Sequence, residues 1–111
     1  MAYHMFFGFN LAPGTTVDAA EEALRAFSDR MIAANRLVST TPIARRHRHP
    51  VLDTAQCINL DYFVTMTFRD RMQANASVKQ IYGRSEPTDS LHNTVIGLLT
   101  DAVFLCVESP H

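Results

Sequence analysis

The sequence lacks tryptophan altogether and contains two cysteines, four glycines and one lysine, Lys79. Two cysteines, Cys57 and Cys106, are too few for the disulfide framework of a small secreted domain. We find no basic start followed by an apolar run that would predict a signal peptide. The longest apolar runs also fall far short of the roughly 20 residues that span a bilayer. The sequence therefore predicts a cytoplasmic protein with no membrane partner.

The sequence also has no large excess of either positive or negative charge. Ten basic and eleven acidic residues give a formal net charge of -1, so the bulk charge does not indicate a nucleic-acid partner. The length of 111 residues is that of a single domain. With 47% hydrophobic residues, the chain is too apolar to be disordered. At this size a fold buries roughly 65% of the surface of the unfolded chain, which leaves a thin core. We therefore expect a single domain over residues 1–111 that gains burial by forming a homodimer.

Hydrophobic periodicity divides the chain into strands and helices. The aromatic run at the start predicts a strand that ends before Pro13, and spacing of three and four predicts helices later in the chain. In chain order the expected elements are a strand over 3–11, a helix over 15–35, a strand over 37–49, a strand over 61–69, a helix ending near Gly83, a short helix over 90–99 and a strand over 102–107. In the second helix the expected core stripe is Ala74, Val78, Ile81 and Tyr82.

This order is β-α-β-β-α-β with one extra short helix, which is typical of the α+β class with a ferredoxin-like, four-stranded antiparallel sheet. Right-handed crossovers place the first and third strands in the middle of such a sheet. Pro42 cannot donate to a strand ladder, which fits an edge position for the second strand. The last strand, AVFLCV, is apolar on both faces, so we expect another chain to cover it.

The residues of the sheet face that is not covered by helices follow from alternation along each strand. Assigning the apolar set of each strand to the helices leaves a mixed aromatic and polar set on the other face. That open face is predicted to carry Phe6, Phe63 and Phe104 among His4, Asn10, Thr65, Thr67 and Arg69. Such a mixture indicates a cavity wall or an interface.

With this element order, apolar last strand and mixed face, the chain resembles the dimeric α/β-barrel superfamily, in which two ferredoxin-like protomers pack sheet against sheet. The resemblance implies a homodimer formed through the open face and the last strand. It also implies a pocket for a small anionic or aromatic ligand, lined by His4, Phe6, Asn10, Phe63, Thr65 and Phe104. The superfamily includes cofactor-independent monooxygenases, isomerases, haem-handling proteins and stress-associated proteins. The absence of tryptophan disfavours the haem-degrading branch.

On this basis we expect a small-molecule-binding protein that needs no cofactor. One interpretation of its role is a cofactor-independent monooxygenase or isomerase-like enzyme. The alternative is a non-catalytic, stress-related or interaction protein. His4 and Asn10 are the candidate catalytic pair, as base and polarising donor for proton abstraction. Their alternative role is that of ordinary hydrogen-bonded interface residues.

The basic run from Arg45 to His49 is the most concentrated local feature. Two histidines at i and i+2, His47 and His49, could reach one metal ion, but no spacing here matches an established zinc pattern, so we expect no metal site. Arg45 and His47 could instead hold an anionic ligand at the mouth of the pocket. A third interpretation is a solvated edge whose charge discourages aggregation.

Two further side chains, Cys106 and His92, and one rival function have to be considered. Cys106 is expected to be an inert small hydrophobe, and His92 is expected to lie on the surface of the short helix. The first-strand segment FFGFNL is similar to the signature of RNA-recognition modules, whose open sheet face binds bases. The third strand lacks the basic and glycine start of that signature, which disfavours nucleic acid as a partner.

Overall fold

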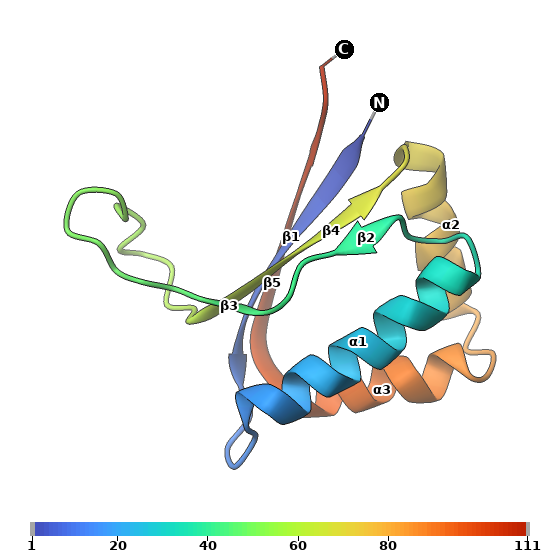
Figure 1. Ribbon diagram of the computed structural model, residues 1–111, viewed down its shortest axis with the longest axis horizontal. Coiled ribbons are helices and arrows are strands. Elements are labelled where there is room, and N and C mark those ends of the chain that lie inside the picture. Colours follow the sequence, from blue (N-terminus) through green and yellow to red (C-terminus); the bar gives the residue numbers. More distant parts are fainter. Residues whose placement is uncertain (1, 111) are drawn as a thin grey trace.

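The computed structural model describes residues 2–110 and has an α+β architecture (Figure 1). Its elements are β1 (Tyr3–Leu11), α1 (Val17–Ala33), β2 (Ser39–Thr40), β3 (Ala44–Arg45), β4 (Tyr62–Phe68), α2 (Arg71–Tyr82), α3 (Thr88–Leu98) and β5 (Leu99–Glu108). The order confirms the ferredoxin-like class predicted from the sequence. No helix among the described residues is long and apolar enough to cross a membrane.

All strand pairs are antiparallel, and the sheet has the order β2-β4-β1-β5, with β3 also pairing with β4. This confirms the central position of β1 and β4. The described part of the chain has five strands where four are predicted, because the expected strand over 37–49 is broken into two short pieces. Pro42, which has no N–H to donate, lies in the break, and residues 46–49 form no strand.

The helices begin where a side-chain oxygen can accept from free backbone N–H groups. Thr16 caps α1, one residue after the predicted start, with its Oγ1 accepting from the N–H of Ala19 at 3.1 Å. Asp70 caps α2, with its Oδ1 accepting from the N–H of Gln73 at 2.9 Å. These caps fix where each helix leaves the sheet.

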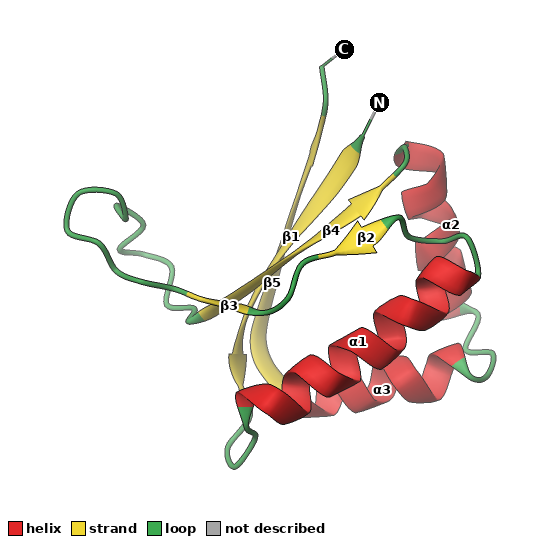
Figure 2. Ribbon diagram, viewed as in Figure 1, coloured by secondary structure: helices red, strands yellow, loops and turns green. Residues whose placement is uncertain are grey.

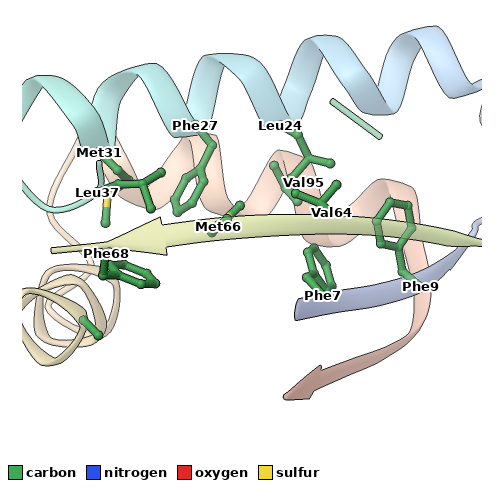
Figure 3. Packing of buried hydrophobic residues seen from close by; sticks show 11 residues of the cluster. Phe7, Phe9, Leu24, Phe27, Met31, Leu37, Val64, Met66, Phe68 and Val95 are labelled. Carbon is green, nitrogen blue, oxygen red and sulfur yellow. The ribbon is translucent and has the colours of Figure 1, made fainter. Parts of the chain in front are cut away.

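The helices gather on one side of the sheet, as Figure 2 shows by colour. The core lies between this layer and the sheet: Phe7, Phe9, Val64 and Met66 point from β1 and β4 toward α1 and α3 (Figure 3). Phe9 is fully buried. The alternating apolar positions of β1 and β4 are therefore on the helix side, as predicted.

The predicted orientation of β5 is wrong. Directly paired residues of antiparallel strands point to the same face, and Phe104 pairs with Phe7 while Cys106 pairs with Met5. Phe104 and Cys106 therefore lie on the helix side, where the rings of Phe104 and Phe7 stack at 4.7 Å between centroids. Because AVFLCV is apolar at every position, alternation along it carries no information about facing.

The buried face of α2 also differs from the predicted stripe. Ala74 is buried as expected, but Val78 is 49% exposed and Tyr82 is 79% exposed. The other buried positions are Gln73 and Ser77, which donate to the backbone oxygens of Asn35 and Arg36 respectively. Hydrogen bonds to the segment after α1, and not apolar packing alone, set the rotation of this helix.

Candidate ligand-binding cavity

A cavity of about 740 Å³ opens between the helix side of the sheet and the helices α2 and α3. Small-molecule sites in proteins have volumes of roughly 300 to 1,000 Å³ and mostly apolar walls. Met5 and Phe7 of β1, Phe104 of β5 and Ile81 of α2 supply such walls here. The exposed Val78 and Tyr82 of α2 also line this space, which explains why apolar side chains are left outside the core.

His92 is the candidate base of the cavity. It lies on α3, half-buried, with its ring 5.6 Å from that of Phe27. Burial lowers the pKa of His92 below its usual value, although Asp89 opposes the shift. The lowered pKa favours the neutral imidazole, which is the form that can accept a proton. The expectation that His92 lies on the surface is wrong, because α3 turns this side chain toward the cavity.

Tyr3 and Cys106 lie together on the cavity wall. A hydrogen bond with the Cys106 side chain, followed by burial, raises the pKa of Tyr3. The phenol therefore stays protonated at physiological pH and can donate to a bound ligand. Sequence reasoning missed Tyr3, which looks like an ordinary aromatic position of β1.

The residues of β1 and β4 that the sequence places on the open face lie on the other side of the sheet from this cavity, whereas Phe104 of β5 does not. His4, Phe6 and Thr65 come together there, because Phe6 pairs with Thr65 and the Nδ1 of His4 lies 2.9 Å from the Oγ1 of Thr67. Phe63, opposite Gly8, extends the same face. Of the six predicted pocket residues only Phe104 lines the cavity.

Asn10 holds backbone and side chains of its own chain together. Its Oδ1 accepts from the N–H of Asp61 at 2.9 Å, and its Nδ2 donates to the oxygen of Asn59 and to Oδ2 of Asp101. It also lies six residues from His4 on one strand, roughly 20 Å away. The structure therefore does not bring His4 and Asn10 together around one small molecule.

The basic run organises residues 46–61, which we call the arm. The Arg46 guanidinium forms a two-pronged ion pair with Asp53, at 2.6 and 2.8 Å, and donates to the backbone oxygens of Ala55, Ile58 and Leu60. Hydrogen bonding to Arg46 lowers the pKa of Asp53 to about 2. Arg48 pairs with Asp61 at 2.8 Å.

The remaining members of the run contact the chain around them. The guanidinium of Arg45 lies 5.9 Å from the centre of the Tyr62 ring. The Nδ1 of His49 accepts from the N–H groups of Val51 and Leu52, and the His47 ring lies 5.9 Å from that of His49. Neither Arg45 nor His47 lines the cavity. Within residues 2–110 no three His, Cys, Asp or Glu side chains are grouped so that they could hold a metal ion.

Comparison with solved structures shows the same fold at low sequence identity. A protein from Arabidopsis thaliana has a TM-score of 0.72 at 8% identity, covering 100% of this chain and 97% of its own. SnoaB from Streptomyces nogalater, described as a cofactor-independent oxygenase, has a TM-score of 0.68 at 8% identity, covering 99% and 94%. A dimeric ferredoxin-like protein of unknown function from a Jannaschia species has a TM-score of 0.66 at 11% identity, covering 98% and 100%.

The fold is that of the dimeric ferredoxin-like proteins. No family model and no curated protein matches the sequence. The likeness to these structures spans nearly the whole chain, as the sequence predicts.

Proposed function

We propose that this chain binds a small, mostly apolar ligand in the cavity on the helix side of its sheet. The observation that carries the proposal is the cavity itself, about 740 Å³ in volume, with aromatic walls and few polar groups. Stacked Phe7 and Phe104 offer a flat apolar surface, which favours an aromatic ligand. In this proposal the pocket predicted on the open face gives way to an interface, to which His4, Phe6, Phe63 and Thr65 belong.

We further propose that the bound ligand loses a proton to His92. The neutral imidazole is the group best suited to accept a proton in the cavity, and the Tyr3 phenol can donate a hydrogen bond to the anion that forms. That anion can take the proton back at another carbon, which is an isomerisation, or pass electrons to dioxygen, which is an oxygenation without a cofactor. The shared fold of the cofactor-independent oxygenase SnoaB supports the second route.

The protein in this proposal is a homodimer that pairs through the open face and β5. Val103, Leu105 and Val107 of β5 are between 42% and 62% exposed on that face. The chain exposes 7199 Å², against about 6,100 Å² expected for a folded monomer of 12.4 kDa. The excess of about 1,100 Å² is larger than the roughly 800 Å² per partner that a standard interface buries, so the surplus surface is sufficient for one interface. Similar solved structures are described as dimeric.

A carbon acid with an aromatic ring tests both the site and the chemistry. We choose 2-tetralone, and we expect calorimetry to show that Val78→Trp, which fills the cavity, weakens its binding by about tenfold, or 1.4 kcal/mol. Val38→Trp is the matched control, because Val38 is also 49% exposed but lies outside the cavity. Equal binding by the two variants would place the ligand elsewhere.

Deuterium exchange into 2-tetralone in D₂O, followed by NMR, tests the proton transfer. The wild-type protein is expected to accelerate the exchange, with a rate that rises through a pKa below 6.5 as His92 loses its proton. His92→Gln should abolish the acceleration and keep the binding. Binding without any acceleration in the wild-type protein would instead favour the non-catalytic alternative.

A further inference from the structure

The arm, residues 46–61, projects from the sheet on the other side of β1 and β5 from the helices (Figure 1). Its last part lies against the open face. A Cβ atom added to Gly8, which would point to that face, would come within 2.8 Å of the side chains of Leu60 and Phe63. Leu60 is 5% exposed for this reason. The arm therefore begins as part of the open face and extends beyond it.

The arm has a fixed shape although it contains no helix or strand. The Arg46 side chain is 8% exposed and acts as the centre of the arm, tying Asp53 and three backbone oxygens to one guanidinium. Asn10 fastens the base of the arm to β1 through Asn59 and Asp61. A loop held in this way loses little conformational freedom on binding, which favours affinity.

Apolar side chains lie on the outside of this arm. Val51 is 73% exposed, Leu52 is 82% exposed and Ile58 is 43% exposed. Polar contacts fill the interior of the arm, so these side chains have no core of their own to enter. Exposed apolar residues on a preorganised projecting loop are typical of a contact surface.

We propose that the arm grips a second copy of this chain, with Val51 and Leu52 buried against the partner subunit. This inference rests on the dimer proposed above. A copy that packs on the open face lies on the side to which the arm projects (Figure 1). The paired residues Phe6 and Leu105 add exposed apolar side chains on that face. Because a two-fold interface uses the same patch twice, each subunit both extends an arm and receives one.

Fluorescence of a single introduced tryptophan tests the inference. The chain has no tryptophan of its own, so Leu52→Trp gives an unambiguous signal from the arm. As the protein is concentrated from monomer to dimer, followed by sedimentation, its emission should shift to shorter wavelength and its quenching by acrylamide should fall. Met72→Trp, on α2 and also highly exposed, is the control and should show neither change.

The outcomes separate the two proposals. Dimer formation with an unchanged signal from Leu52→Trp would overturn the role of the arm and leave the dimer standing. A wild-type chain that sediments as a monomer at every concentration would overturn the dimer and, with it, the arm contact. A shift that tracks dimer formation supports both.

Discussion

Arg46 shows how one buried charge can determine the structure of a long connection. Its guanidinium offers five N–H donors, and these reach the two carboxylate oxygens of Asp53 and the backbone oxygens of Ala55, Ile58 and Leu60. Lysine has a single charged centre and could not make this set of contacts. The shape of the arm therefore depends on arginine at this one position.

Acid should loosen the arm before it unfolds the core. The folded pKa of Asp53 is about 2, below its ordinary 3.8, so its contribution to stability is complete above about pH 4 and is lost as the pH falls through 2. We expect protection of arm amides from hydrogen exchange to fall across this window. Asp53→Asn should remove the dependence, and Asp29→Asn, on exposed α1 surface, should keep it. Arm protection that stays constant from pH 5 to pH 2 would contradict the role given to this pair.

Among the helices, α2 relies on its N-terminal cap for stability, because its buried residues, Gln73, Ala74 and Ser77, supply little apolar packing. Asp70→Ala removes the acceptor for the N–H of Gln73, and we expect the free energy of unfolding in urea to fall by about 1 kcal/mol. Asp29→Ala, in the C-terminal half of α1, removes an exposed carboxylate without a capping role and serves as the control. Equal stability of the two variants would show that the Asp70 cap contributes nothing.

The elements with a regular pattern are those the sequence predicts best. The strand over 3–11 is found with the same limits, and β4 and α3 begin and end within two residues of expectation. The rest depends on contacts between distant residues. Asn10 meets Asn59 and Asp101, 49 and 91 residues away, and no local pattern reports such partners.

The candidate site could be predicted only in part, for the same reason. The sequence predicts Phe104 in a pocket and the residue does line the cavity, but alternation along β5 assigns it to the wrong face of the sheet. The sequence predicts His92 on the surface because helical spacing turns it away from Leu91 and Val95, whereas the packing of α3 beside Phe27 decides its surroundings. Helical spacing predicts which residues share one face of a helix, but it does not predict which other elements pack against that face.

The whole molecule is flat and less compact than a typical domain of its length. It measures 42 × 41 × 19 Å, and its radius of gyration is 14.4 Å, against about 13 Å for a compact domain of this length. Helices cover one side of the sheet, and exposed apolar residues of β5 lie on the other side, which is the arrangement expected if a second copy covers that side. This shape explains why the candidate cavity and the proposed interface occupy opposite faces of one sheet.

In the proposed function the ligand lies on the helix side of the sheet. Isotope-filtered NMR of 2-tetralone bound to the methyl-labelled protein tests this position, because it reports the methyl groups that touch the ligand. We expect contacts to Val78 and Ile81 on α2, which line the cavity. Contacts to Val103 and Leu105, which share a face with His4 and Phe6, would place the ligand on the open face and overturn the proposed site.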